Sequence, residues 1–423
     1  MKIKVVKGSE DLYPLEFRRK EFLVNSFKDI CKKYDYQFVQ TPVFESLELL
    51  CAKGGEEIKN QFFVLEKKGS EELGLRFDMT VPCARLFVQK QLELTKPTRW
   101  AYADENFRYE RPQAGRARAF TQLGCEVYGS DSVLADAEQL NIIIDTFKII
   151  GLTNHDFSIR VNDRNFLEGV LVDLVGATKV FEVISAFDKF NKIGEDNFFL
   201  LLTKDLSIDR DVADSLCSLV KIRGGKEKLL ELDNYAKNEQ AKKGLSTLKQ
   251  ISEFVDMHYV EFDMSIARGL DYYSGFVFEG FDKYGYFRAL CGGGRYDNMI
   301  EQFGGQKTAA VGFAIGVVPI TLLLEKLGKF PSFENKVDYF LTTVGEDLDI
   351  KKYALHITKK LRHDNKSCNL DISNRAMGKK FAYAESIGVE NIIIVGENEV
   401  KDKTISMKNL KTGEQKIVKF DEL

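Results

Sequence analysis

The stretch from Phe107 to Glu126 holds the densest set of side chains that could do chemistry. It reads Phe-Arg-Tyr-Glu-Arg-Pro-Gln-Ala-Gly-Arg-Ala-Arg-Ala-Phe-Thr-Gln-Leu-Gly-Cys-Glu, in which Pro112 to Gly115 has the composition of a turn between two strands. Because side chains alternate along a strand, Arg108 and Glu110 are expected on one face of the first arm. The second arm is expected to present five further side chains on one face: Arg116, Arg118, Phe120, Gln122 and Glu126.

Arginines grouped around an aromatic ring are suited to binding a nucleotide. Guanidinium groups form bidentate hydrogen bonds with phosphate oxygens, and the ring can stack on a base. The alternative for this stretch is a surface hairpin with ion pairs, which contribute little to stability when exposed.

A second stretch, Leu75-Arg-Phe-Asp-Met-Thr80, also alternates. Arg76, Asp78 and Thr80 are expected to face one way, and a carboxylate beside a hydroxyl suits an ammonium group. The alternative is that Asp78 or Thr80 caps a helix that begins near Pro82.

Two glycine-rich stretches follow later in the chain. Ala267 to Gly275 places Arg268, Tyr272 and Tyr273 between glycines that permit tight turns, and Cys291 to Asp297 contains three consecutive glycines. Each could form the wall of a binding site. The first could equally be a surface turn, and a lone glycine run is more often a hairpin or a bulge.

Some kinds of chemistry are disfavoured by what the sequence lacks. There is no G-x-x-x-x-G-K-[ST] pattern, and all four histidines (His155, His258, His356, His363) lie outside these stretches. Acid-base catalysis by histidine is therefore not expected. The predicted chemistry uses arginines, carboxylates and Mg²⁺, and no metal-ligating residues are identified.

Length and composition describe an ordinary globular protein. The chain has 423 residues, of which 44% are hydrophobic and 30% charged, and a net charge of -3. Disorder, collagen and coiled coil are excluded as the main architecture, and two or three domains are expected at about 100 to 200 residues each. Seven scattered cysteines without a C-x-x-C pair argue against a disulfide framework and a zinc knuckle. Without an apolar leader or a membrane span, a cytoplasmic location is predicted.

The spacing of apolar residues predicts the elements that carry these stretches. A helix over 14–33 leads into the segment 36–45, which alternates like a strand until Pro42. Strands follow near 73–80, 99–110 and 116–129, with a helix over 82–94 between the first two. This order favours a largely antiparallel sheet with helices packed on it. A helical insertion is expected at about 166–255, and strand character returns over 259–320.

The end of the chain alternates differently. Strands near 337–343, 368–372 and 391–396 are separated by helices over 348–365 and 375–387, which predicts a small doubly wound α/β domain. The predicted division is a first domain over 1–330, including the insertion, and a second over 335–423.

Taken in order, these stretches resemble those of the histidyl-tRNA synthetases, a family of class II aminoacyl-tRNA synthetases, over nearly the whole chain. The resemblance rests on five segments and the C-terminal domain. Lys7 to Pro14 resembles the N-terminal signature, Tyr34 to Glu45 resembles motif 1, and Phe107 to Gln122 resembles motif 2. Arg268 to Tyr273 and Gly292 to Asp297 resemble the two histidine-specific motifs. The domain from about 335 resembles the family's anticodon-binding module.

This resemblance implies an α+β catalytic core with a six-stranded antiparallel sheet and flanking helices, and a homodimer formed through motif 1. It also implies ATP-dependent ligation of histidine to tRNA(His) through histidyl-adenylate, with ATP and Mg²⁺. No membrane partner is expected.

The resemblance further implies a role for each site residue. Arg268 and Arg108 would be catalytic and would act on the α-phosphate. ATP would also contact Glu110 through the adenine amino group, Phe120 by stacking, and Arg116 through the outer phosphates. The α-ammonium of histidine would contact Asp78, Thr80 and Gln122. Its imidazole would contact Glu126 and Tyr273, with Tyr272 beside them. The acceptor end of the tRNA would contact Gln113.

One segment departs from the family pattern. Val311 to Ile320 resembles motif 3, but Pro319 stands where class II enzymes generally carry an arginine against ATP. Either other arginines, such as Arg116 or Arg118, hold the triphosphate, or ATP use is impaired. The alternative function is a catalytically silent, histidine-sensing paralogue resembling the regulatory subunit of ATP phosphoribosyltransferase. Such regulators usually lack an anticodon-binding domain.

Overall fold

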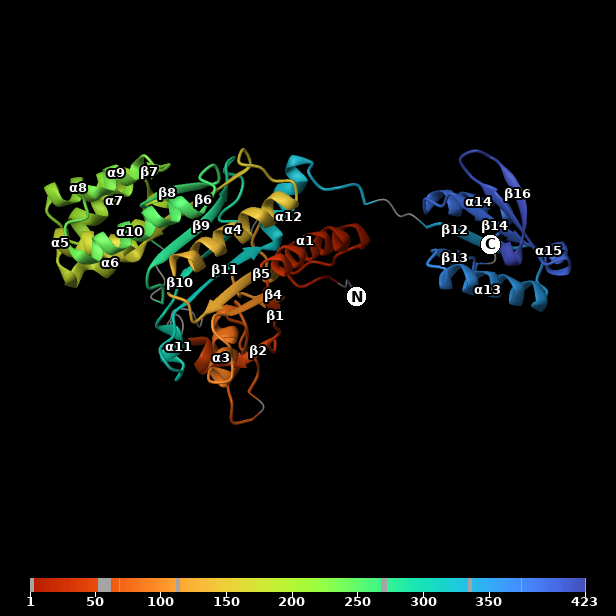
Figure 1. The fold of residues 1–423 in the computed structure, drawn as a ribbon, viewed down its shortest axis with the longest axis horizontal. Coiled ribbons are helices and arrows are strands. Elements are labelled where there is room, and N and C mark those ends of the chain that lie inside the picture. Colours follow the sequence, from red (N-terminus) through yellow and green to blue (C-terminus); the bar gives the residue numbers. More distant parts are fainter. Residues whose placement is uncertain are drawn as a thin grey trace. The chain divides into compact units, whose positions relative to one another are not determined.

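The computed structural model describes residues 4–51, 62–67, 69–111, 115–267, 272–333, 337–373 and 375–422. The chain divides into two compact units, Met1–Phe330 and Pro331–Leu423, each of which is described by itself (Figure 1). No helix among the described residues combines the length and the apolar character that crossing a membrane requires.

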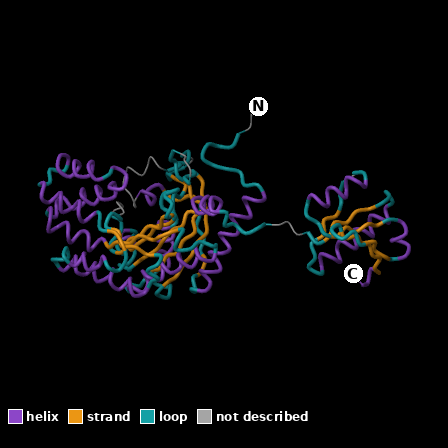
Figure 2. Tube along the Cα trace, turned by 90° about the horizontal axis from the view of Figure 1, so that it is seen from above, coloured by secondary structure: helices purple, strands orange, loops and turns teal. Residues whose placement is uncertain are grey.

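The first unit is built on one large sheet, whose strands gather at its centre with helices around them (Figure 2). Six neighbouring strands are antiparallel throughout, which confirms the predicted six-stranded sheet. In spatial order they are β4 (Thr98–Phe107), β5 (Ala119–Tyr128), β11 (Ala310–Gly316), β10 (Cys291–Arg295), β9 (Phe276–Asp282) and β6 (Phe157–Asp163).

Short strands extend this sheet at both ends. β1 (Gln37–Phe38) pairs parallel with β4, and β8 (Val260–Asp263) pairs parallel with β6 and is followed by β7 (Arg223–Gly224). Because β6 and β8 are neighbours, the chain leaves the sheet for the insertion and re-enters it one strand away.

Helices α1 (Pro14–Lys33), α4 (Val133–Ile149) and α12 (Val317–Leu327) pack against one another and the sheet. The predicted helix over 14–33 is confirmed: Pro14 begins it, and Leu23, Phe27 and Ile30 bury one face at the i, i+4, i+7 spacing.

The predicted strand over 73–80 is wrong beyond its first residues. β3 (Leu73–Leu75) pairs with β2 (Phe44–Ser46) and forms a bridge to Val64 through Gly74, and only residues 76–79 separate β3 from α3 (Thr80–Lys90). The strand cannot reach residue 80 because α3 begins there, with Asp78 Oδ1 accepting a hydrogen bond from the amide of Val81 (3.4 Å). The Arg76 side chain points inward and donates hydrogen bonds to the carbonyls of Thr41 (2.7 Å) and Glu105 (2.9 Å). Two further short helices complete this part, α2 (Leu47–Cys51) and α11 (Met299–Gln302).

The predicted insertion is helical, as Figure 1 shows in yellow-green to green. Asp163 begins it by accepting hydrogen bonds from the amides of Asn165 (2.8 Å) and Phe166 (3.3 Å), which caps the first helix. Its helices are α5 (Arg164–Val175), η2 (Ala177–Lys179), α6 (Val180–Ile193), α7 (Glu195–Leu200), η3 (Leu201–Asp205), α8 (Arg210–Val220), α9 (Lys228–Asp233) and α10 (Glu239–Phe254).

The second unit has the predicted doubly wound centre. β13 (Cys368–Leu370), β12 (Tyr339–Thr343) and β14 (Asn391–Val395) are parallel, with Leu341 packing among the residues of α13 (Leu348–His363) and Phe340 among those of α14 (Met377–Ser386). The rest of this sheet was not predicted from the sequence. It consists of the antiparallel strands β15 (Thr404–Asn409) and β16 (Gln415–Lys419), with α15 (Glu397–Asp402) before them and η4 (Phe420–Glu422) after them.

Candidate active site

A cavity of about 590 Å³ opens on the six-stranded sheet of the first unit. Its walls come from segments far apart in the sequence: the start of α3, the β4–β5 hairpin, the entry to β9, and strands β10 and β11. Most of the predicted site residues line it, namely Asp78, Thr80, Arg108, Glu110, Arg116, Phe120, Gln122, Tyr272 and Tyr273.

Two predicted residues, Arg268 and Gln113, lie outside the described part of the chain. Arg118 is not among the residues that line the cavity. Its guanidinium instead donates to the carbonyls of Glu110 (3.1 Å) and Lys7 (3.4 Å) and lies over the ring of Tyr109. The expectation that Arg118 shares a face with Phe120 is wrong, because β5 begins only at Ala119 and the alternation does not extend before it.

Arg108 is a half-buried cation in the cavity wall. Its Nε donates to the carbonyl of Phe77 (3.0 Å), and its guanidinium lies 5.1 Å from the centre of the Phe120 ring. Burial lowers the pKa of Arg108, while Asp78 and Glu110 oppose that shift. An arginine stays charged despite such a shift, so the cavity holds a fixed positive charge beside a flat ring.

Glu110 and Arg116 form an ion pair across the hairpin. Arg116 Nη2 donates to Glu110 Oε1 over 2.8 Å, and Arg116 Nε contacts the other carboxylate oxygen. Both side chains line the cavity, so a ligand that uses either of them has to compete with the pair.

Asp78, Thr80 and Gln122 form the polar part of the wall. Asp78 Oδ1 accepts a hydrogen bond from the amide of Val81 (3.4 Å), so the carboxylate supports the start of α3 and also lines the cavity. Asn106 Nδ2 donates to Gln122 Oε1 over 3.0 Å and fixes its side chain. A carboxylate, a hydroxyl and an amide grouped in this way can accept from or donate to an amino acid's ammonium and carboxylate.

Glu126 lies beneath the cavity floor and is fully buried. The hydroxyl of Tyr296 donates to Glu126 Oε2, and that of Tyr102 lies 3.4 Å from Glu126 Oε1. Burial and the Glu126 charge raise the pKa of Tyr296, which keeps its hydroxyl as a donor. Gly312 makes room for this arrangement, because a Cβ there would collide with the Glu126 carboxylate.

The two tyrosines of the third stretch are held against the glycine strand. Tyr272 and Tyr273 stack with their ring centres 4.3 Å apart, and both line the cavity. Gly294 of β10 has φ +153°, and a Cβ there would come within 3.0 Å of the Tyr273 ring. The glycine run is therefore a packed central strand, which the alternative reading of a hairpin or bulge did not anticipate.

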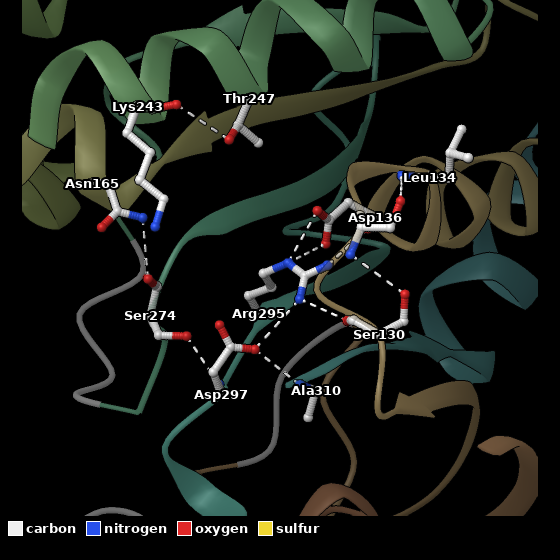
Figure 3. A network of polar contacts seen from close by, with 11 residues as sticks. Ser130, Leu134, Asp136, Asn165, Lys243, Thr247, Ser274, Arg295, Asp297 and Ala310 are labelled. Carbon is white, nitrogen blue, oxygen red and sulfur yellow. Dashed lines mark hydrogen bonds and ion pairs between the residues drawn. The ribbon is translucent and has the colours of Figure 1, made fainter. Parts of the chain in front are cut away.

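A buried network anchors this wall (Figure 3). The amide of Ser274 donates to the carbonyl of Arg295, and the Ser274 hydroxyl accepts from the amide of Asp297, both over 2.9 Å. Arg295 in turn donates to the carbonyls of Ser130 (3.0 Å) and Ser132 (2.9 Å) and pairs with Asp136 at the start of α4. The segment that ends the third stretch is thus tied through Arg295 to α4.

Several residues that line the cavity were not predicted from the sequence. Asp188 reaches it from α6 of the insertion, Glu279 from β9, Arg288 from the segment before β10, and Tyr296 from directly after β10. Tyr296 lies in the Cys291 to Asp297 stretch and could have been found there. The other three stand in no repeating pattern, and only the folded chain brings them together.

The comparisons with known proteins agree with this geometry. Residues 8–320 match the family model described as histidyl-tRNA synthetase, and residues 338–423 match that of the anticodon binding domain. The histidine–tRNA ligase of Methanocaldococcus jannaschii is 38% identical, covering 99% of this chain and 97% of its own length. That of Haloarcula marismortui is 35% identical, covering 97% of this chain and 94% of its own.

Solved structures show the same fold. The crystal structure of histidyl-tRNA synthetase from a Nostoc species superposes with a TM-score of 0.82 at 29% identity, covering 100% of this chain and 98% of that one. A Bacillus halodurans protein described as an ATP phosphoribosyltransferase regulatory subunit/histidyl-tRNA synthetase superposes with a TM-score of 0.79 at 23% identity. The superposition covers 94% of this chain and 99% of that one, and at this identity it supports the fold alone. With both domain models and full-length relatives in agreement, the chain belongs to the histidyl-tRNA synthetase family.

Proposed function

We propose that this chain attaches histidine to its tRNA in two steps. In the first, a carboxylate oxygen of histidine forms a bond with the α-phosphorus of ATP, and the bond from that phosphorus to the bridging oxygen breaks, releasing pyrophosphate. In the second, a ribose hydroxyl at the 3′ end of the tRNA forms an ester with the histidyl group, and AMP leaves. The observation that carries the proposal is one cavity that combines the Arg108–Phe120 pair with the Asp78, Thr80 and Gln122 wall.

The first step needs no general base, because the nucleophile is already a carboxylate. The barrier falls when the two reactants are held in position and fixed positive charge meets the charge that develops on the phosphate. Arg108 supplies such a charge inside the cavity, and Arg268 is proposed to supply a second. Phe120 offers the face on which adenine would stack, and Glu110 an acceptor for its amino group once Arg116 turns to phosphate.

Magnesium fits this cavity as an ion held mainly by ATP. The described residues contain no group of three or more His, Cys, Asp or Glu that could hold a metal. Mg²⁺ at nucleotide sites typically takes one or two carboxylates together with substrate phosphates, and Glu279 is a carboxylate of the cavity wall that suits this role. When bound, the ion neutralises phosphate charge.

Selection of histidine is proposed to depend on polar pairing at the imidazole. Tyr273 and the buried Glu126 would pair with the two ring nitrogens, Tyr272 would pack beside them, and Tyr296 holds Glu126 in place. A side chain that cannot pair leaves buried polar groups unsatisfied, and such sites discriminate by roughly 10⁴ without editing.

The parts outside the cavity are proposed to handle the tRNA. The second unit would read the anticodon, since residues 338–423 match the anticodon binding domain. Gln113, which follows β4 and precedes β5 in the sequence, would touch the acceptor end.

A homodimer is proposed through the segment 34–45. The support is that this segment carries three exposed large apolar side chains within seven residues: Phe38, Val43 and Phe44 are 42%, 43% and 48% exposed in the single chain. A partner subunit would cover such side chains if they lie together. β1 of the same segment is the last strand at its end of the sheet.

A histidine-dependent ATP–pyrophosphate exchange assay tests the proposed function. Exchange with histidine, followed by charging of tRNA(His), is the expected result. Histidine binding without exchange would favour the sensing paralogue instead. That alternative has less support, because the curated relatives over the full chain are histidine–tRNA ligases.

A further inference from the structure

Arg288 is an arginine of the cavity to which no role has been given. It lies between β9 and β10, and its side chain is exposed and lines the cavity. The described residues supply it with no hydrogen-bond acceptor, carboxylate or aromatic ring. An arginine left in this state offers all its donors to a ligand, and a guanidinium prefers phosphate or carboxylate oxygens.

The other arginines that line the cavity are already engaged. Arg108 donates to the Phe77 carbonyl and lies over Phe120, and Arg116 is paired with Glu110. Among the described residues, Arg288 is therefore the cavity's unpaired basic side chain. A triphosphate that entered the cavity would meet one positive charge without first breaking a protein contact.

The position of Arg288 is set by main-chain contacts with the turn that leads into α12. The amide of Gly316 donates to the carbonyl of Leu290 over 3.0 Å, so the segment 288–290 runs beside the Gly316–Pro319 turn. The hairpin reaches the same place from the other side. A Cβ at Gly115 would lie 3.6 Å from the Phe287 ring and 3.9 Å from the Pro319 ring. Arg116, Arg288 and Pro319 thus flank one end of the cavity.

This end contains a proline where another cation could stand. Pro319 occupies the first turn of α12, where the amides have no partner within the helix and a proline is tolerated. It adds neither charge nor donor to the cavity. Arg288 faces the same space from the neighbouring segment.

We propose that Arg288 binds the outer phosphates of ATP and thereby supplies the positive charge that Pro319 cannot supply in this chain. The inference rests on the proposed function, since it takes ATP as the ligand. Adenine and the α-phosphate would lie at Phe120 and Arg108, so the β- and γ-phosphates extend toward the end of the cavity that holds Arg288. Arg288 is then a binding residue for the part of ATP that leaves as pyrophosphate.

The experiment measures ATP–pyrophosphate exchange and nucleotide binding in the full chain and in Arg288→Ala. The expected result is a KM for ATP raised about 10-fold or more, as for loss of a charge-assisted hydrogen bond, with the KM for histidine changed less than about twofold. AMP lacks the outer phosphates, so its affinity by calorimetry is expected to stay the same while that of ATP falls. Introducing Pro319→Arg into Arg288→Ala is expected to restore part of the lost ATP affinity.

Arg210→Ala is the matched control, because Arg210 is an exposed arginine of α8 that does not line the cavity. An unchanged KM for ATP in Arg288→Ala overturns the inference, as does an equal loss of AMP and ATP affinity. If the parent chain shows no exchange at all, the proposed function fails, and the ratio of ATP to AMP affinity in parent and variant still decides the role of Arg288.

Discussion

Arg295 and Asp136 form a buried ion pair between the end of β10 and the first turn of α4, with Arg295 Nε 2.9 Å from Asp136 Oδ1. Their side chains are only 9% and 1% exposed. The same guanidinium donates hydrogen bonds to the carbonyls of Ser130 and Ser132, which precede α4. The main chain of Arg295 and Asp297 is hydrogen-bonded to Ser274. One arginine therefore links α4 to the residues that follow Tyr273.

Replacing Arg295 is expected to destabilise the first unit. In Arg295→Gln the Asp136 carboxylate loses its partner, and breaking a buried pair commonly costs about 3 to 5 kcal/mol in the free energy of unfolding. Urea unfolding at pH 8 measures this through the fluorescence of Trp100, the chain's one tryptophan, which is buried beside Phe87 and Tyr128 in the first unit. Adding Asp136→Asn is expected to recover part of the loss; a loss below about 1 kcal/mol in the single variant would contradict a buried pair.

The raised pKa of the buried Asp136 carboxyl should make the stability of the first unit depend on pH. Burial raises the pKa of Asp136 to about 7, against the opposing effect of Arg295. Between about pH 4 and pH 7 the folded chain keeps a proton that the unfolded chain releases, so this contribution to stability is full below pH 4 and lost as the pH rises to 7. Relative to Asp136→Asn, whose amide does not titrate, the parent should lose up to about 4 kcal/mol across this range. A constant difference between the two proteins from pH 4 to 8 would mean that the carboxyl does not titrate there.

Glu126 is expected to act on histidine and not on ATP. Glu126→Gln keeps the size of the side chain but removes the charge that would pair with the imidazole, while Tyr296 and Tyr102 stay close to it. We expect the KM for histidine in the exchange assay to rise about 10- to 100-fold, as for loss of a hydrogen bond to a charged group. The KM for ATP is the internal control, and an equal rise in both constants would point to general damage.

Arg268 is expected to act on the rate. If its cation neutralises charge on the α-phosphate as the carboxylate attacks, Arg268→Ala should lower the rate of adenylate formation by about 10² to 10³, by comparison with other donors of this kind. Single-turnover formation of histidyl-adenylate measures this directly. A near-normal rate would refute the catalytic role.

The first unit is expected to form the adenylate without the second unit, which is expected to be needed for charging tRNA. The second unit has its own hydrophobic cores, one of which includes Leu341, Ile357 and Ile393. A chain that ends at Phe330 should therefore keep histidine-dependent exchange but lose most of its tRNA charging, because the anticodon is no longer read. Exchange that is lost together with charging, in a truncated chain whose Trp100 fluorescence is native, would mean that the second unit is needed for the chemistry.

Local patterns in the sequence predicted much of the fold. The helix over 14–33 and the two arms of the hairpin follow from apolar spacing and turn composition, which act over a few residues. The pairing of β6 with β8 across the whole insertion depends on contacts between residues far apart, and nothing local signals it. Strand β16 was missed for another reason, since a polar, exposed edge strand carries little of the expected apolar alternation. Strand β15 does alternate, with Ile405 and Met407 buried, and this short signal was overlooked.

The candidate site divides in the same way. Phe120 and Gln122 were found because they alternate along β5, and both line the cavity. Asp78 and Thr80 line it too, but at the start of α3 and not on the strand that the alternation predicted. Arg76 was assigned to the same face by that alternation, but its guanidinium is held by Thr41 and Glu105, which the local pattern cannot reveal. Arg288 was missed because a single arginine in a connecting segment gives no signal until the chain has folded around the cavity.

Asp188 brings the insertion into the wall of the cavity, although the helices that carry it leave the sheet at Asp163 and return to it at Val260. This block is tied to the rest of the first unit at several places: it joins β6 to β8, its own strand β7 pairs with β8, and α10 packs against α4 and β6. Deleting the insertion would therefore also remove Asp188, and with it part of the cavity wall.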